Sequence, residues 1–528
     1  MKRFTELIAS LDNTTSSSVK TLLLSEYFIS EVEELDKLWA IALFTGKRPP
    51  RTINTTLLRT WCAEQADIPL WLFEQNYHIV GDLAETIALI VTGNHQSIDK
   101  ALYLWINEIQ GLKTSTEEEK KMYMLQAWQS LDSSSVWVLN KLITGGFRIG
   151  VSKNIVIKAL SKATGQDANK IAYHLTGNWS PLNTTWQQLF DFDNSASDLS
   201  KPYPFFLAYS LEVDLAHTIH PDEWLAEWKW DGIRGQLILR SGEIYLWSRG
   251  EELITENFPE ISSLNDSVAE FVIDGEILAW SAGKPLDFQK LQTRIGRKNP
   301  GKKLLADVPV VFMAYDIIEK GKSDIRTQPF EFRRKILEEL IMELNSPNIL
   351  ISPLVHFDDH FELSYLRNTA KVGGAEGLML KKKSGIYHTG RKSGDMWKWK
   401  MDPYTIDAVL IYAQRGHGRR ATLFSDFTFA LREGDRLVPF AKAYSGLTDA
   451  EMAEITAFVR SNTLETFGPV TSVKPELVFE LAFEGISLST RHKSGISVRF
   501  PRISRWRKDK KSDEANTLED IRRMAGLL

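Results

Sequence analysis

The stretch Glu227-Trp228-Lys229-Trp230-Asp231-Gly232-Ile233-Arg234 sets one lysine among apolar residues and follows it with an acid, a glycine and an arginine. Residues 236–239 and 243–247 then alternate like two strands around Arg240-Ser241-Gly242. This pattern predicts a β-hairpin with Lys229 in the turn just ahead of it, fixed by a sheet edge and open to a substrate. For so short a motif a solvated lysine beside a turn is the simpler explanation, so the rest of the chain decides.

Five further motifs follow in a fixed order. They are Ser248-Arg249-Gly250, Val272-Ile273-Asp274-Gly275-Glu276, Val311-Phe312-Met313-Ala314-Tyr315-Asp316, Ala375-Glu376-Gly377-Leu378-Met379-Leu380-Lys381 and Trp397-Lys398-Trp399-Lys400. A closing segment runs from Arg499-Phe500-Pro501-Arg502 through Arg507-Lys508-Asp509-Lys510. In this order the motifs resemble those of the covalent nucleotidyltransferases and, among them, the ATP-dependent DNA ligases, nearest to the bacterial B-type. The resemblance is strong over residues 202–511 and looser over the amino-terminal part.

Length and composition set the outer bounds. A chain of 528 residues is too long for one core and suggests three domains. No apolar run approaches the roughly 20 residues that span a bilayer, so no membrane partner is expected. The single cysteine, Cys62, excludes an intramolecular disulfide and fits a reducing cytosol; beside Trp61 it is expected to be a core residue. The amino terminus lacks an apolar h-region, so a cytoplasmic protein is expected.

The net charge of −4 conceals three basic runs, at residues 290–303, 381–400 and 491–511. Acidic residues gather elsewhere, at 31–36 and 117–119. One such run alone is typical of a solvated face. Three of them in the part that carries the motifs favour a polyanionic substrate.

The amino-terminal part, residues 1–200, is predicted to be all-α. Asp82 with Glu85 forms a capping-box start for a helix that Gly93 ends, and further helices are expected at 135–142 and 152–163. The glycine-rich joint between these two carries Arg148. It is either a contact for DNA phosphates or a plain helix–helix turn. The resemblance favours the contact and implies a helical DNA-binding domain.

Two more domains are predicted to follow. Residues 201–402 alternate strands with short helices, and the resemblance implies an α+β nucleotidyltransferase (adenylation) domain. After the joint Met401-Asp402-Pro403, residues 403–528 contain short strands typical of a small β-barrel, which in the family is an OB-fold. Thr517 with Asp520 caps a short carboxyl-terminal helix.

By resemblance Lys229 is the catalytic nucleophile. It attacks the α-phosphate of ATP, releases pyrophosphate and keeps AMP, which then passes to the 5′-phosphate of a nick before the 3′-hydroxyl displaces it. The chemistry is coherent because a nick phosphate has no leaving group until adenylylation supplies one. A lysine amine ordinarily has a pKa of about 10.4. Nearby cations, burial and Mg²⁺ are therefore expected to favour the free amine.

The resemblance also assigns the nucleotide contacts. They are Glu227, Arg234, Arg249, Glu276, Phe312, Arg391, Lys398, Lys400, Arg507 and Lys510. Glu276 and Glu376 are hard oxygen donors suited to Mg²⁺ or Mn²⁺. Phe312 is expected to stack on the adenine, although an aromatic residue on an apolar strand is usually core. Lys398 and Lys400 alternate with tryptophans and should share one strand face.

Three assignments stay open. The spacing to Lys398 lets Lys392 compete with Arg391, and Asp274 has either a structural or a functional role. Two rival functions remain, an RNA ligase or capping-type nucleotidyltransferase and a non-catalytic DNA-binding scaffold. The helical amino-terminal part and the R-x-D-K ending argue against the first, and the intact nucleophile and paired acids against the second. The expected partner is nicked duplex DNA, bound by a monomer. The family suggests roles in DNA repair, replication or recombination and association with a helicase and a nuclease.

Overall fold

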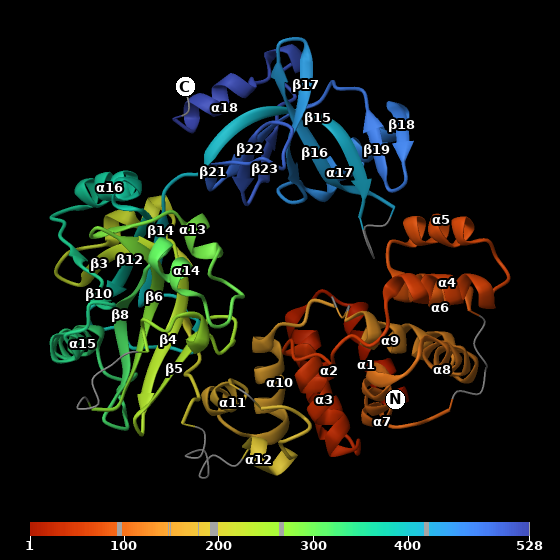
Figure 1. Cartoon of the computed structure of the whole chain (residues 1–528), viewed down its shortest axis with the longest axis horizontal. Helices are drawn as coiled ribbons and strands as arrows, with labels where there is room; N and C mark the ends of the chain where they lie inside the picture. Colours follow the sequence, from red (N-terminus) through yellow and green to blue (C-terminus); the bar gives the residue numbers. More distant parts are fainter. Residues whose placement is uncertain are drawn as a thin grey trace. The chain divides into compact units, whose positions relative to one another are not determined.

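The computed structural model describes residues 1–526 apart from 92–97, 146, 148, 178, 191–198, 263–268 and 417–421. Figure 1 labels the helices and strands along the chain. The chain divides into two compact units. One contains Met1–Asn13, Arg48–Ile149 and Pro403–Leu528, and the other contains Thr14–Lys47 and Gly150–Asp402. The joint predicted at Met401-Asp402-Pro403 falls on this division, whereas the amino-terminal helices contribute to both units.

Helices are the regular elements of residues 1–190. They are α1 (Lys2–Asp12), α2 (Ser17–Ile29), α3 (Glu34–Phe44), α4 (Thr55–Gln65), α5 (Leu70–Val80), α6 (Leu83–Ile90), α7 (Leu102–Gly111), α8 (Glu117–Ser130), α9 (Ser133–Thr144), α10 (Lys153–Thr164), α11 (Ala168–His174) and α12 (Trp186–Phe190). Asp82 caps α6 by accepting a hydrogen bond from the Glu85 amide, and α9 and α10 confirm two predicted helices. Gly93 and Arg148 lie outside the described residues.

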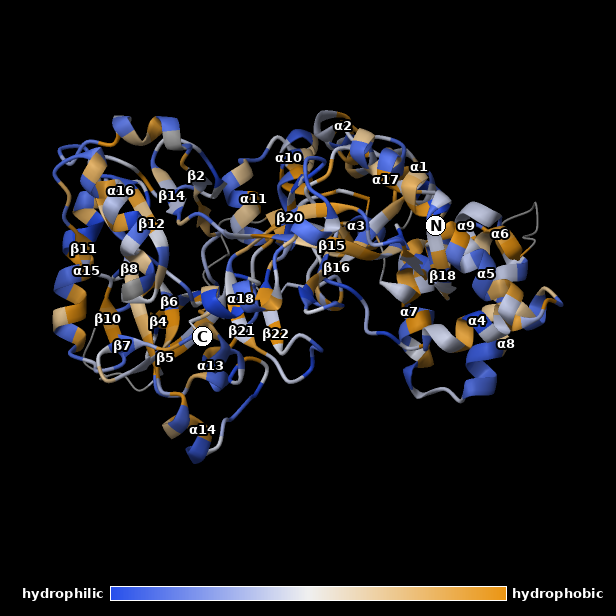
Figure 2. Cartoon of the chain, turned by 90° about the horizontal axis from the view of Figure 1, so that it is seen from above, coloured by the Kyte–Doolittle hydropathy of each residue, from blue (hydrophilic) through white to orange (hydrophobic). Residues whose placement is uncertain are grey.

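The helical region is held by ordinary buried cores. Cys62 is fully buried in α4, and burial raises the pKa of its thiol to about 12, so it is the core residue that the sequence predicts. Hydrophilic and hydrophobic residues alternate along these helices (Figure 2), which is the pattern of helices with one face packed inward. Within the described ranges, none of the helices has the length and apolarity that a bilayer crossing requires.

Two main β-sheets form the middle of the chain. Their strands are β1 (Phe206–Leu207), β2 (Tyr209–Ser210), β3 (Trp224–Trp230), β4 (Ile233–Arg240), β5 (Glu243–Ser248), β6 (Phe271–Ser281), β7 (Lys284–Pro285), β8 (Val310–Lys320), β9 (Ser323–Asp324), β10 (Ile349–Ile351), β11 (Leu354–Val355), β12 (Ala375–Lys382), β13 (Gly390–Arg391) and β14 (Met396–Lys400). One sheet has the order β10-β8-β6-β4-β5, with β7 and β9 paired to β6 and β8. The other has the order β11-β3-β12-β14-β2, and β1 pairs with β13.

Helices pack on these sheets. They are α13 (Phe288–Gln292), α14 (Lys302–Asp307), α15 (Phe330–Leu344) and α16 (His360–Thr369). The helix α15 lies against β8 and β10, where Leu337 and Leu340 join a core with Leu237 and Phe271. Its buried face also includes Arg334, which reaches the site described below.

The hairpin predicted after Lys229 is confirmed, but the place of Lys229 is different. β4 and β5 pair around Ser241 and Gly242, which have φ of 50° and 78° as a type I′ turn requires. Lys229 lies within β3, next to its end, and not in a turn. The strand extends this far because Trp228 and Trp230 pair with residues of β12, a partner about 150 residues away in the sequence.

The carboxyl-terminal region is a half-barrel sheet of OB-like form. Its elements are β15 (Tyr404–Arg415), β16 (Phe424–Glu433), β17 (Arg436–Ala443), α17 (Asp449–Ser461), β18 (Thr463–Phe467), β19 (Val470–Val473), β20 (Val478–Phe483), β21 (Gly485–Leu488), β22 (Ile496–Arg499), β23 (Arg502–Trp506) and α18 (Leu518–Met524). The sheet order is β17-β16-β15-β19-β18, and β20 pairs with both β15 and β23. Thr517 and Asp520 form the predicted capping box of α18.

Gly377 shapes the end of β12 that faces Lys229. It has φ of 144°, and a Cβ there would lie 2.3 Å from the Trp399 carbonyl oxygen and 2.7 Å from the Lys400 Cα. Because both contacts are to backbone, Gly377→Ala should destabilise the folded protein by about 2–4 kcal/mol. Urea unfolding checks this, with Gly373→Ala as the control because a Cβ at Gly373 meets nothing within 4 Å. An equal effect of the two variants would contradict the prediction.

Candidate active site

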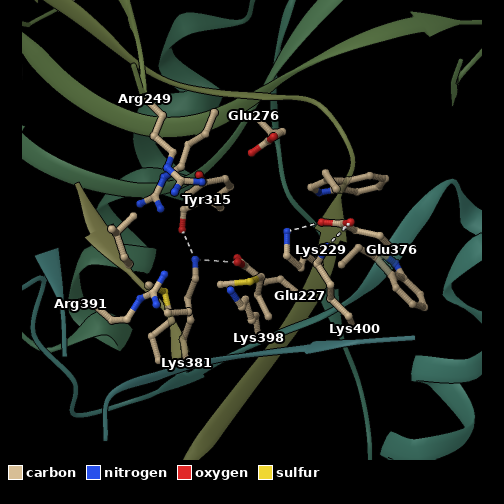
Figure 3. A pocket seen from close by; sticks show the side chains of 17 residues that line it. Glu227, Lys229, Arg249, Glu276, Tyr315, Glu376, Lys381, Arg391, Lys398 and Lys400 are labelled. Carbon is tan, nitrogen blue, oxygen red and sulfur yellow. Dashed lines mark hydrogen bonds and ion pairs between the residues drawn. The ribbon is translucent and has the colours of Figure 1, made fainter. Parts of the chain in front are cut away.

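A pocket of about 270 Å³ opens between the two sheets (Figure 3). The sheet β11-β3-β12-β14-β2 supplies one wall from β3, β12 and β14. The sheet β10-β8-β6-β4-β5 supplies another from β4, β6 and β8. The pocket brings together nine of the twelve predicted site residues: Glu227, Lys229, Arg234, Arg249, Glu276, Glu376, Arg391, Lys398 and Lys400. These nine come from motifs spread over more than 170 residues of sequence.

Lys229 is held by a carboxylate from the neighbouring strand. Its Nζ donates a hydrogen bond to the Glu376 Oε1 at 2.5 Å, and the Lys400 Nζ lies 2.9 Å from the Oε2 (Figure 3). The shift of register between Ala375 and Leu378, at Gly377, turns Glu376 toward both amines. Burial opposes ionisation of Glu376, but Lys229 and then Lys400 outweigh it and lower the pKa of this carboxyl.

Glu227 is a buried carboxyl group in the pocket wall, where burial raises its pKa and Lys381 and Arg334 act in the opposite direction. Only 1% of its surface is exposed, and its carboxylate binds the Arg334 Nη1 and the Lys381 Nζ, each at 2.7 Å. Lys381 also donates to the Tyr315 carbonyl oxygen at 2.8 Å. A buried carboxylate is stable when it is paired in this way, so Arg334 and Lys381 fix the position of Glu227.

Asp274 has a structural role that the sequence left open. It is fully buried and accepts hydrogen bonds from the Arg234 Nε and Nη2 at 3.2 and 2.7 Å and from the Tyr387 hydroxyl at 2.7 Å. The Tyr315 hydroxyl is 3.3 Å away. This bidentate pairing fixes the plane of the Arg234 guanidinium at the pocket wall.

The carboxyl group of Glu276 is mostly protonated at neutral pH. Burial raises the pKa of its carboxyl to about 8, against the opposing effects of Lys229 and Arg234. The folded state therefore binds this proton more tightly than the unfolded chain, in which the pKa is about 4.5. The resulting stabilisation is fully present below pH 4.5 and is lost as the pH rises through 8.

We expect Glu276→Gln to weaken the pH dependence of stability, because glutamine cannot titrate. Between pH 5 and pH 8.5 the urea midpoint of the variant should fall less than that of the parent protein. Glu243→Gln, at an exposed strand start, is the control and should follow the parent. Parallel curves for the parent and Glu276→Gln would contradict the assignment.

The pocket has a basic face. Arg249, Arg391, Lys398 and Lys400 all line it, and the predicted alternation of β14 is confirmed because Trp399 is buried on the opposite side. Burial lowers the pKa of Lys398, helped by the neighbouring Arg391 and Lys229. Lys392, the competitor of Arg391, is exposed and does not line the pocket.

Phe312 lies elsewhere than predicted. It is fully buried in the core between β6 and α15, and its ring fills the space above Gly275, where a Cβ would meet it at 2.4 Å. Tyr315, from the same motif, lines the pocket instead. Phe312 and Tyr315 are three residues apart in β8, so the alternation of the strand places them on opposite faces. Their odd spacing in the sequence could have indicated that only one of them faces the pocket. No feature of the sequence indicated that Arg334 pairs with Glu227.

Arg507 and Lys510 belong to the other unit, at the end of the half-barrel. The Asp407 Oδ2 accepts hydrogen bonds from the Arg507 Nη1 at 2.8 Å and the Lys510 Nζ at 2.7 Å. Asp407 is only 5% exposed, and Arg507 also binds Asp509 at 2.7 Å. The two predicted cations thus share one buried anion.

The basic runs are not wholly solvent-facing. Arg294, in the first run, is fully buried and binds both oxygens of Glu260, and Lys381, in the second, is the buried partner of Glu227. Arg297 and Lys298 are exposed. The expectation of a polyanion-binding surface therefore loses these two residues, whose charges are neutralised inside the protein.

Comparison with known proteins identifies the family of the chain. Family models match in three consecutive parts: the DNA ligase N terminus over residues 1–161, the ATP dependent DNA ligase domain over 206–400 and the ATP dependent DNA ligase C terminal region over 420–510. A probable DNA ligase of Koribacter versatilis is 34% identical, over 72% of this chain and 70% of the relative. DNA ligase 1 of Korarchaeum cryptofilum is 26% identical, over 99% and 97% of the two chains.

Solved structures agree on the fold. The structure of Pmar-Lig_PreS3 covers 95% of this chain and 99% of its own, with a TM-score of 0.64 and 15% identity, a likeness that shows the fold alone. The relatives in sequence set aside an RNA-directed or non-catalytic function. The chain therefore belongs to the ATP-dependent DNA ligases, enzymes that take AMP from ATP and seal nicks by nucleotidyl transfer.

Proposed function

We propose that Lys229 is the residue of this ligase that carries AMP, and that the pocket between the two sheets transfers AMP from ATP to the 5′-phosphate of a nick. One observation carries the proposal: the Lys229 amine meets Glu376 at 2.5 Å in a pocket that six further cationic side chains line, namely Arg234, Arg249, Lys381, Arg391, Lys398 and Lys400. A nucleophilic amine beside clustered positive charge suits attack on a phosphate ester.

In the first step the Lys229 Nζ forms a bond to the α-phosphorus of ATP, and the bond to pyrophosphate breaks. Glu376 accepts a hydrogen bond from the amine and sets its direction. The basic face neutralises charge that grows on the phosphate oxygens, because phosphoryl transfer is chiefly positioning and charge stabilisation. The low pKa of Glu376 keeps it anionic, which suits a group that orients cations.

We assign the adenine to the wall formed by Tyr315. Its ring lines the pocket, whereas Phe312 is buried in the core, and an aromatic face favours stacking with a flat base. Glu227 and Arg234 then border the nucleoside, each fixed by the buried pairs described above.

The carboxylates fit a divalent ion that is held through few protein ligands. Among the described residues no three His, Cys, Asp or Glu side chains cluster as a metal site, so Glu276 and Glu376 would share the ion with substrate oxygens and water. Glu276 would have to lose the proton that its raised pKa retains before it could bind the ion. When bound, Mg²⁺ or Mn²⁺ supplies neutralisation of the triphosphate charge.

We further propose three functional domains, with DNA binding by residues 1–200, adenylation by 201–402 and an OB-fold at 403–528. Their support is the order of the matched family regions and the half-barrel sheet. A monomeric state and association with a helicase and a nuclease stay predictions from the family.

Sealing of a nicked duplex tests the proposal directly. With ATP the protein should join the nick and pass through a protein–AMP adduct, and with NAD⁺ or no nucleotide it should not. Labelled GTP should give no adduct, which separates the ligase from a capping enzyme. An adduct formed with ATP by a protein that joins nicked RNA but not nicked DNA would contradict the assignment of the substrate.

A further inference from the structure

A turn at residues 248–252 faces both the nucleotide pocket and the amino-terminal helices. It follows β5 and places Arg249 at the pocket wall. Two residues later Glu251 forms an ion pair with Lys153, the first residue of α10. The two side chains are only 28% and 29% exposed, and the Lys153 Nζ is also 3.4 Å from the Thr176 hydroxyl. The turn thus joins the pocket to the helical region within one compact unit.

The backbone of the turn is fixed at several points. The Ser248 amide donates to the Glu252 carbonyl oxygen at 2.9 Å, the Glu251 amide to the Ser248 carbonyl oxygen at 3.0 Å, and the Arg249 amide to the Arg234 carbonyl oxygen at 2.9 Å. Glu251 has φ of 60°, a left-handed conformation that residues with a Cβ disfavour. A glutamate at a position that suits glycine indicates that its side chain is needed there, and its partner is Lys153.

A second lysine of the helical region strengthens this contact. The Lys47 Nζ donates to the carbonyl oxygens of Gly177 and Trp179 at 2.6 and 2.9 Å and lies 5.1 Å from the centre of the Trp179 ring. Burial lowers the pKa of Lys47, while Glu251 acts in the opposite direction. Glu251 therefore interacts with two cations from separate segments of the helical region.

We propose that Lys153 is a positioning residue for AMP transfer: through Glu251 it fixes the turn that presents Arg249 to the nucleotide phosphates. This rests on the proposed role of Arg249 in the pocket. The helical region then contributes to the nucleotide step as well as to DNA binding. The competing role for a lysine at the start of a helix is a contact with DNA phosphate, which would not act on a reaction that contains no DNA.

The test is protein–AMP formation measured without DNA over a range of ATP concentrations. Lys153→Met and Glu251→Gln should each raise the KM for ATP about ten-fold and change the maximal rate less, as expected for lost positioning of a binding group. Glu251→Gly should raise the KM for ATP as much as Glu251→Gln does. Its turn should stay undisturbed, because glycine adopts positive φ freely. Lys158→Met, at an exposed position of α10, and Glu252→Gln, at an exposed position of the turn, are matched controls that should keep the parent KM.

The exchanged pair decides between positioning and general support. Lys153→Glu combined with Glu251→Lys restores the ion pair and should bring the KM for ATP most of the way back to the parent value. Either substitution alone should leave the KM raised. An unchanged KM in Lys153→Met with weaker binding of nicked duplex would make Lys153 a DNA contact and overturn the inference. Arg249→Ala separates the two proposals. If Arg249→Ala leaves the KM for ATP unchanged, the proposed role of Arg249 in binding the nucleotide is wrong. If Arg249→Ala raises the KM but the Lys153 and Glu251 variants keep the parent KM, only the positioning of Arg249 by Lys153 and Glu251 is rejected.

Discussion

Arginine in place of Lys229 should abolish transfer of AMP to the protein, by more than about a thousand-fold, and leave the fold and the binding of nicked duplex intact. The guanidinium keeps a positive charge for the pair with Glu376, but with a pKa above about 12 it has no free lone pair for attack on phosphorus. Incubation with labelled ATP, followed by denaturing electrophoresis, measures the adduct.

The control for this variant lies on the same sheet. Lys382→Arg changes a lysine of β12 that pairs with Glu223 outside the pocket, and it should form the adduct normally. Circular dichroism and a nicked-duplex binding curve show that Lys229→Arg is folded. Acid-labile AMP on Lys229→Arg would move the nucleophile to another residue.

Arg507→Ala and Lys510→Ala should each slow protein–AMP formation by about a hundred-fold and still seal a nick that already carries a 5′-adenylate. We propose that their charges stabilise the departing pyrophosphate, which is absent once the DNA is adenylated. The two compact units divide at Asp402–Pro403, where the resemblance to ligases predicts a hinge that would let the half-barrel serve this step and then a later one. Measuring the two reactions separately gives the comparison.

Arg505→Ala is the matched control, because Arg505 lies on β23, is exposed and pairs with Glu480 at 2.9 Å. It should not alter protein–AMP formation. If Arg507→Ala and Lys510→Ala form the adduct at the normal rate but fail on the adenylated nick, both residues are DNA contacts and take no part in the first step.

Local features could be predicted from the sequence because short-range physics determines them. The turn at Ser241-Gly242, the cap of α6 at Asp82 and the capping box at Thr517 each depend on two to four neighbouring residues. The end of β3 could not be predicted in the same way. Trp228 and Trp230 stay in the strand through pairing with β12, and the sequence near Lys229 carries no sign of that partner.

The candidate site shows the same division. The motifs predicted which residues meet, and nine of them line one pocket. The odd spacing of Phe312 and Tyr315 shows that they lie on opposite faces of β8, but alternation alone does not show which of the two faces meets the pocket. Charge runs likewise give the sign of a residue but not its partner: Arg294 and Lys381 are cations that Glu260 and Glu227 neutralise inside the protein.

If Arg507 and Lys510 contact the nucleotide as predicted, the carboxylate of Asp407 makes that contact an exchange of one anion for another. Arg507 and Lys510 already direct donors to its Oδ2, and the Oδ1 is buried without a hydrogen-bond partner among the described residues. A phosphate oxygen can bind these donors only by displacing or sharing a ligand that the protein itself provides. A simple inorganic anion in solution must compete with the same Asp407 carboxylate for Arg507 and Lys510. The two cations should therefore bind a polyphosphate best when the rest of the enzyme already holds it in position.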